Sequence, residues 1–137
     1  MRLKILLIFS TLWLCVGVGD MCAQTEIYIS DESALREFAT KVNNGTYVNV
    51  TAYLTADIAL TIAWNPIGNT TKPFKGHFEG WGHKITNLSI TGSSDYAGLF
   101  GYIDGGSVRD VGVESGSIKG GNYVGGICGC LGDTNGG

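Results

Sequence analysis

The residues best suited to hold a metal ion lie between positions 77 and 83. His77 and Glu79 alternate along the chain, and His83 follows four residues later. Two imidazoles and a carboxylate could bind zinc if a strand and a turn folded back on each other. The sequence places no further strong ligand nearby, so solvated turn residues are the stronger interpretation. We therefore expect neither a metal site nor a bound cofactor.

Two cysteines, Cys128 and Cys130, are the next candidates for chemistry. Side chains at i and i+2 of a strand point to the same face, so the pair does not form a disulfide framework. We interpret them as small apolar fillers, or as one partner of a bond to a later part of the chain. Their role stays open at this stage.

Four carboxylates could in principle serve acid–base chemistry on a polysaccharide: Asp95, Asp104, Asp110 and Glu114. They are scattered through expected turns and strand edges, and no Arg or Lys recurs beside two of them. We therefore predict no catalytic residue and no enzyme activity in this chain. Glycan lyase or hydrolase activity of a longer parent chain is an alternative, for which Asp104 and Asp110 are the pair to neutralise.

Exposed aromatic side chains are the strongest candidates for binding. Trp81, Tyr102 and Tyr123 lie in or beside expected turns, and aromatic rings with an open face stack well on sugar rings. Trp81 stands between two glycines, which favours its exposure. A competing interpretation is that Tyr96 and Tyr102 form an internal stack. We take Trp81, Tyr102 and Tyr123 as the candidate ligand-binding residues.

The first residues indicate export. Arg2 and Lys4 precede an apolar run over 5–19, and the small residue Ala23 stands before the expected cleavage point. This pattern predicts a signal peptide over 1–23, cleaved after Ala23, and no membrane span in the mature chain. We expect a secreted or cell-surface protein. Cleavage would leave seven Lys and Arg against eleven Asp and Glu, so nucleic acid is not an expected partner.

The elements that follow begin with a short strand and a helix. Glu26–Ile29 reads as a strand, and apolar residues at helical spacing predict a helix over Asp31–Val42. Ser30 and Asp31 are good helix N-caps, and Gly45 is a stop signal. We predict that residues 24–46 form a strand-helix cap.

Internal repeats dominate the second half of the chain. Residues 83–90 align with 106–113 at an offset of 23, and residues 98–103 align with 126–131 at an offset of 28. Short strands and glycine turns repeating at this period are typical of solenoids. We predict an all-β fold: a right-handed parallel β-helix (β-solenoid) over 47–137, behind the cap and truncated at the C-terminus. If the chain is complete, a partner is expected at the open edge of the last coil.

Three segments resemble bacterial surface proteins with GLUG-motif repeats: Trp64–Gly68, the Phe/Gly-rich run Phe74–Ile90, and Tyr96–Tyr102. Cys128 and Cys130 depart from the pattern by replacing the usual aromatics. The resemblance implies an exported, repeat-rich, adhesin-like protein. We expect a non-enzymatic surface display or adhesion segment with an extracellular glycan or a host or surface protein as partner. A passive structural spacer is a further alternative.

Overall fold

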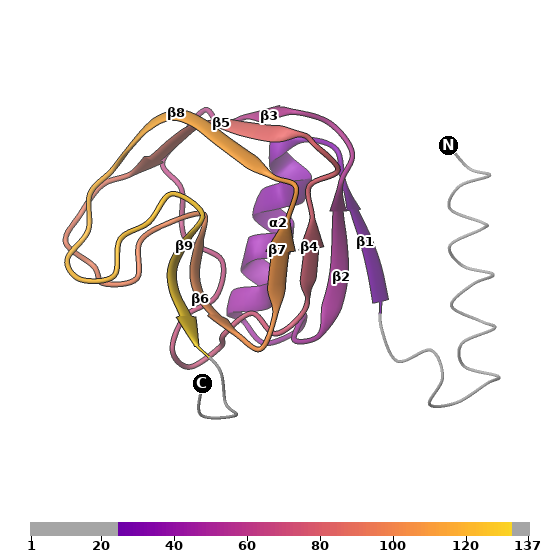
Figure 1. The fold of residues 1–137 in the computed structure, drawn as a ribbon, viewed down its shortest axis with the longest axis horizontal. Coiled ribbons are helices and arrows are strands. Elements are labelled where there is room, and N and C mark those ends of the chain that lie inside the picture. Colours follow the sequence, from indigo (N-terminus) through magenta and orange to yellow (C-terminus); the bar gives the residue numbers. More distant parts are fainter. Residues whose placement is uncertain (1–24, 133–137) are drawn as a thin grey trace, which may run out of the picture.

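The computed structural model describes residues 25–132, which fold into short strands around one helix (Figure 1). The signal peptide predicted over 1–23 and its cleavage point lie outside the described residues. No helix within residues 25–132 is long and apolar enough to cross a membrane. In chain order the elements are β1 (Thr25–Ile29), α2 (Glu32–Asn43), β2 (Val50–Leu54), β3 (Ile58–Ala59), β4 (His77–Glu79), β5 (Lys84–Ile90), β6 (Phe100–Asp104), β7 (Ser107–Arg109), β8 (Gly112–Ile118) and β9 (Cys128–Gly132).

The described strands form three small parallel sheets. The first has the order β1-β2-β4-β7, the second β3-β5-β8, and the third β6-β9. Each strand pairs with one that lies 25 to 30 positions away in the sequence, for example Tyr28 with Tyr53 and Glu79 with Arg109. Strands far apart in the chain therefore lie side by side, and the residues opposite one another form rows across each sheet.

Helix α2 forms where its capping residues predict. The Asp31 side chain accepts a hydrogen bond of 2.8 Å from the Ala34 amide, and Asp31 itself has an extended backbone. The chain leaves the helix at Asn44 and turns at Gly45, whose φ of 87° favours glycine. The helix predicted over Asp31–Val42 is thus confirmed to within one residue at each end.

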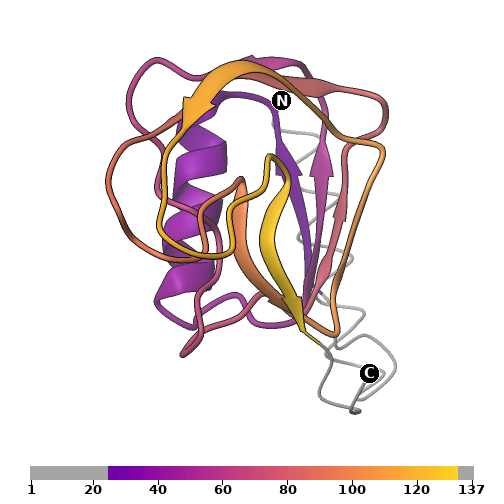
Figure 2. The same cartoon turned by 60° about the vertical axis from the view of Figure 1, so that its left-hand side comes forward.

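Four phenylalanines join the helix to the sheets. Phe38 of α2 lies 5.8 Å from Phe74 and 5.9 Å from Phe78, measured between ring centroids, and Phe100 lies 5.2 Å and 5.3 Å from the same two rings. All four side chains are fully buried. Figures 1 and 2 show β1, β2 and β4 together on one side of α2. The helix therefore packs inside the same core as the strands.

The predicted fold class is wrong. The described chain is a small mixed domain with three short parallel sheets, and it is neither all-β nor a β-solenoid with a helical cap. The apolar spacing identified strands, but it carries no information on how strands divide among sheets. The helix was expected to cover the end of a coil, whereas Phe38 contacts rings from the middle of the chain because burying that stripe stabilises a common core.

The two repeat alignments have different outcomes. The offset of 28 is confirmed, because Phe100 pairs with Cys128 in the β6–β9 register. The offset of 23 is wrong: Ile85 pairs with Val113, and Val108 pairs with Phe78. An apolar-x-x-apolar-x-apolar pattern fits either alignment, so backbone pairing alone decides the register.

Candidate functional site

The candidate site lies on the outer face of the four-stranded sheet. Alternation along β1 and β2 buries Ile29 and Leu54 and turns Tyr28 and Tyr53 outward. Because the two strands pair in parallel, Tyr28 stands directly beside Tyr53. Their ring centroids are 5.2 Å apart with an interplanar angle of 20°, which is a stacked arrangement.

Trp81 completes this group, which we call the aromatic cluster (Tyr28, Tyr53, Trp81). Its ring centroid lies 4.7 Å from that of Tyr53 and 6.5 Å from that of Tyr28. The contact requires a tight turn after β4. Gly80 fits there because an added Cβ would collide with the Asp110 backbone, and Trp81 has a φ of 51°. This left-handed turn folds the indole back over the tyrosines.

Neighbouring backbone holds the turn in place. The Gly80 amide donates to Arg109 O at 2.7 Å, and the Gly82 amide donates to Asp110 O at 2.9 Å. The His83 amide closes the turn by donating to Gly80 O at 3.0 Å. Hydrogen bonds to the last residue of β7 and to the residue after it therefore hold this turn, in which Trp81 adopts a strained positive φ.

The aromatic cluster keeps much of its surface open. Trp81 is 54% exposed and Tyr28 is 46% exposed, although both contact other rings. Large aromatic side chains are usually more buried, because exposed apolar surface costs about 25 cal/mol per Å². An ordered, exposed aromatic surface of this kind is typical of binding sites.

Carboxylates border the cluster. The Tyr28 hydroxyl donates to Glu26 Oε2 at 3.1 Å. Partial burial and this hydrogen bond raise the pKa of Tyr28 above its ordinary value. Partial burial, followed by the charges of Glu26 and Glu79, likewise raises the pKa of Tyr53. Both tyrosines therefore stay protonated at neutral pH beside two negative charges.

The structure separates the three predicted binding residues. Trp81 belongs to the aromatic cluster, whereas Tyr102 and Tyr123 lie with Tyr96 in a second group. Tyr96 and Tyr123 are stacked with centroids 4.9 Å apart, and Tyr96 and Tyr102 are 5.6 Å apart. The competing interpretation of an internal Tyr96–Tyr102 stack is wrong, because these two rings meet at an interplanar angle of 59° and both are only half-buried.

Sequence reasoning missed Tyr28 and Tyr53 as part of the site. A signal was present: both stand at outward positions of alternating strands, separated by 25 residues. That signal becomes useful only when the register is known, because a shift of one residue would move either ring to the other face.

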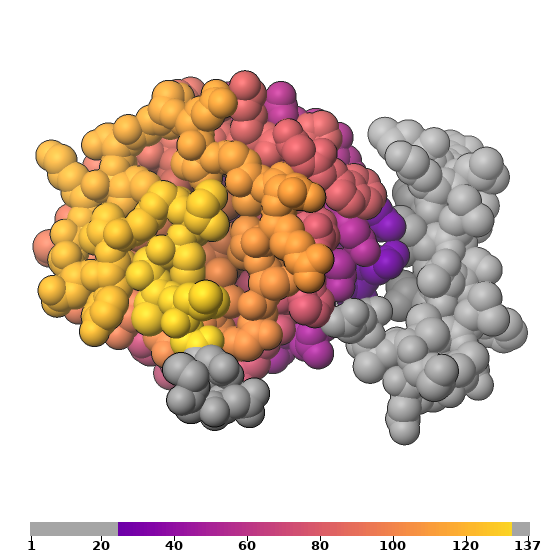
Figure 3. Space-filling view, viewed as in Figure 1, coloured from indigo at the N-terminus to yellow at the C-terminus, as the bar shows by residue number. Residues whose placement is uncertain are grey.

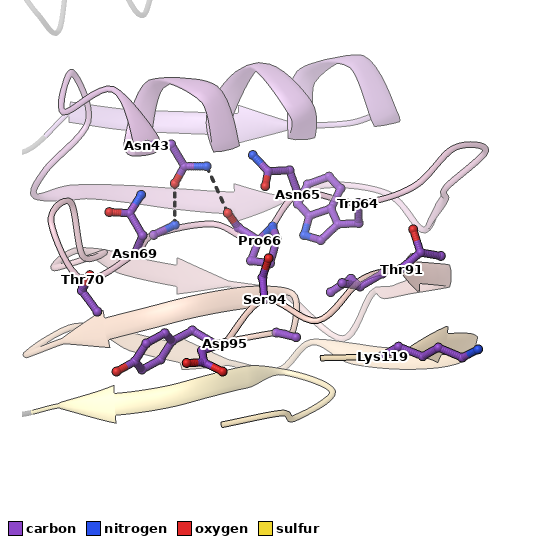
Figure 4. Close-up of a pocket in the computed structure, with 14 residues that line it drawn as sticks. Asn43, Trp64, Asn65, Pro66, Asn69, Thr70, Thr91, Ser94, Asp95 and Lys119 are labelled. Atoms are coloured by element: carbon purple, nitrogen blue, oxygen red, sulfur yellow. Dashed lines mark hydrogen bonds between the residues drawn. The ribbon is translucent and has the colours of Figure 1, made fainter. Parts of the chain in front are cut away.

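A pocket of about 330 Å³ lies between the 64–70 segment and the 91–97 loop (Figure 4). Much of its wall serves the fold. The Asn43 amide accepts from the Gly68 amide at 2.7 Å and donates to Pro66 O at 3.0 Å, and Trp64 Nε1 donates to Leu99 O at 3.0 Å. Hydroxyl and amide groups at the rim, with Lys119 at one end, could contact a small polar molecule.

The two histidines considered as metal ligands contact different residues. His77 Nδ1 lies 2.7 Å from Ser107 Oγ, and His83 Nδ1 lies 3.2 Å from Asp57 Oδ1. The Lys84 amide, and then His83, hold the pKa of Asp57 below its ordinary value. Within residues 25–132, no three His, Cys, Asp or Glu side chains gather in a way that could hold a metal ion.

The four carboxylates considered for catalysis lie in separate environments. Asp104 lies 3.6 Å from Lys75 Nζ, and Glu114 lies 3.3 Å from Lys84 Nζ. Asp95 accepts from the Asn122 amide at 2.7 Å, and Asp110 occupies a left-handed turn. These contacts give each carboxylate a structural partner or position, and they point to no shared acid–base pair.

The cysteines are free thiols, both half-buried in β9. Burial raises the pKa of Cys128, whose Sγ donates to Cys130 O at 2.9 Å. A raised pKa keeps a thiol protonated and lowers its reactivity. This environment supports the interpretation of Cys128 as an apolar filler.

Comparison with known proteins gives one similarity. The chain is 35% identical over 117 residues to halomucin of Haloquadratum walsbyi, and the match covers 77% of the chain. The matched region makes up 1% of halomucin, so the chain spans a very small part of that relative. No protein family matches the chain, and no solved structure matches it. The resemblance to GLUG-motif proteins therefore stays a prediction.

Proposed function

We propose that this chain is a surface-associated, non-enzymatic segment that binds glycans through the aromatic cluster. The similarity to halomucin supports a secreted or surface-associated protein. That similarity identifies no ligand. The geometry of the aromatic cluster supports a glycan as the ligand class.

The exposure of Trp81 is the observation that carries the proposal. The ring is ordered by a hydrogen-bonded turn and by contact with Tyr53, yet more than half of the side chain meets solvent. Sugar rings present C–H groups to such surfaces. Pairs of aromatic rings gain about 0.5–1.5 kcal/mol beyond area burial, and we take this as the scale for a sugar packed on the indole. The indole N–H of this exposed side chain is a hydrogen-bond donor that can serve a sugar hydroxyl.

The position of the cluster also suits a long ligand. The rings come from β1, β2 and the turn after β4, so they extend across three neighbouring strands. Figure 3 shows the later residues, in orange and yellow, covering the face toward the viewer, whereas β1, in indigo, lies at one side. A polysaccharide could lie along the outer face of β1, β2 and β4 without meeting β8 or β9, which belong to the other two sheets.

The test is a glycan-binding measurement on the wild type and two matched variants. Trp81→Asn removes the indole and keeps a residue that tolerates φ > 0. Tyr123→Asn is the control, because Tyr123 is 57% exposed, has a φ of 59° and lies outside the cluster. Titration by calorimetry should show affinity falling by about 1 kcal/mol or more, roughly fivefold, for Trp81→Asn.

We expect Tyr123→Asn to bind like the wild type, with both variants melting at similar temperatures. Equal loss in both variants would show that binding does not depend on the cluster. Absence of binding to every glycan of a broad panel would contradict the proposal and would favour a passive spacer.

A further inference from the structure

The polar groups around the aromatic cluster are mostly hydrogen-bond acceptors. Glu26 accepts from the Tyr28 hydroxyl and also interacts with Tyr53. A carboxylate has about four acceptor positions, so Glu26 can accept further hydrogen bonds from a ligand. Glu79 stands next to Tyr53 in the β2–β4 register. A ligand lying on the rings therefore meets two carboxylates, one on each side of Tyr53.

Arg109 is paired with one of these two carboxylates. Arg109 Nε lies 3.8 Å from Glu79 Oε1, a long contact, and the Arg109 side chain is 68% exposed. Ion pairs of this kind are weak and screened by solvent. Glu26 has no ion pair with another residue in the described part of the chain. Two carboxylates therefore border the rings against one paired cation, and the pKa of Tyr53 is raised first by partial burial and then by the charges of Glu26 and Glu79.

We infer that the aromatic cluster selects glycans that carry protonated amino groups, such as glucosamine polymers, and disfavours glycans with carboxylate or sulfate groups. This inference rests on the proposed glycan-binding function. An ammonium group on a sugar would be attracted by the charges of Glu26 and Glu79. It would also be attracted by the face of the Trp81 ring, which acts on cations within about 6 Å. A uronate would place a like charge beside the same carboxylates.

The test compares glucosamine oligosaccharides with their N-acetylated forms and with galacturonic acid oligosaccharides of equal length. The full chain should bind the amine form about two- to fivefold more tightly than the acetylated form, and the uronate form most weakly. Glu26→Gln keeps the hydrogen-bonding shape and removes the charge, so it should reduce the preference for the amine. Glu114→Gln, on β8 of another sheet, is the matched control for overall charge.

The outcomes separate the selectivity from the underlying function. Equal affinity for the amine and acetylated forms, with both weakened by Trp81→Asn, would refute the selectivity and leave glycan binding standing. Equal effects of Glu26→Gln and Glu114→Gln would show that net charge alone is responsible, which also refutes the local selectivity. Failure of all three oligosaccharides to bind, with binding to another glycan of the broad panel, would refute the selectivity alone, whereas failure of every glycan of that panel would refute both proposals.

Discussion

Glu32 ties the start of α2 to the turn that follows β3, and neutralising it is the sharpest test of how the helix is held. Glu32 Oε1 accepts from the Thr61 amide at 3.1 Å, and Oε2 accepts from the Thr61 hydroxyl at 2.8 Å. Arg36 Nη2 lies 2.7 Å from Oε1 and also donates to Ile62 O at 2.8 Å. The carboxylate and the guanidinium thus form one network between the helix and the turn.

This network lowers the pKa of Glu32 from 4.5 to about 2, chiefly through the Thr61 amide and then through Arg36. At 1.36 kcal/mol per pKa unit, the ceiling on its contribution to stability is about 3.4 kcal/mol. The side chain is 21% exposed, so solvent screening lowers this figure. We expect Glu32→Gln to reduce the free energy of unfolding at pH 7 by about 1–2 kcal/mol.

The sign of the pH dependence follows from the lowered pKa. The stabilisation is fully present above pH 4.5, where the carboxylate is ionised in both states, and it is lost as the pH falls toward 2. Urea denaturation at pH 7, 4.5, 3 and 2 should therefore show the gap between wild type and Glu32→Gln closing through this range. Glu37→Gln is the control, because Glu37 is 66% exposed and its ion pair, with Lys41, lies within the same helix. We expect it to change stability by less than about 0.5 kcal/mol. A Glu32→Gln variant as stable as the wild type at pH 7, or a gap that persists unchanged at pH 2, would refute this reasoning.

Two further predictions concern the backbone, and denaturant unfolding checks both. Gly76→Ala should lower the free energy of unfolding by about 2–3 kcal/mol, because the added Cβ would collide with the Val50 backbone. Gly126→Ala is the control: its Cβ would meet nothing within 4 Å, so we expect a change of less than about 0.5 kcal/mol. Equal effects of the two variants would contradict the packing argument. Asp31→Ala should lower the free energy of unfolding by about 1 kcal/mol, because it removes the N-cap hydrogen bond from the Ala34 amide. Asp31→Asn should retain most of the stability, since asparagine is also a good N-cap. An alanine variant as stable as the wild type would show that the cap contributes nothing.

Part of the candidate site could be predicted from the sequence. Trp81 was identified because it stands between glycines in a turn, and glycines on both sides of a large aromatic residue indicate a tight bend that leaves the ring exposed. Tyr123 is likewise exposed at 57%. The sequence could not show that these two residues belong to different groups, since that depends on which strand edge each turn lies beside.

Local physical chemistry sufficed for the elements near the N-terminus. The position of α2 can be predicted from local signals: the cap at Asp31, the 3.6-residue spacing of Leu35, Phe38 and Val42, and the stop at Gly45. The short extended segment Glu26–Ile29 was likewise predicted as a strand from its own residues, and it lies within β1. These features depend on residues within a few positions of each other, so the sequence alone was enough.

The tertiary structure decided the rest. Whether the helix caps a coil or packs in the core depends on Phe38 meeting Phe74 and Phe78, 36 and 40 positions away. Tyr28 joins Trp81 only because parallel pairing in a single register brings β1, β2 and β4 together. A repeat pattern permits several registers, and only the burial of side chains and the pairing of backbone groups over the whole domain selects one of them.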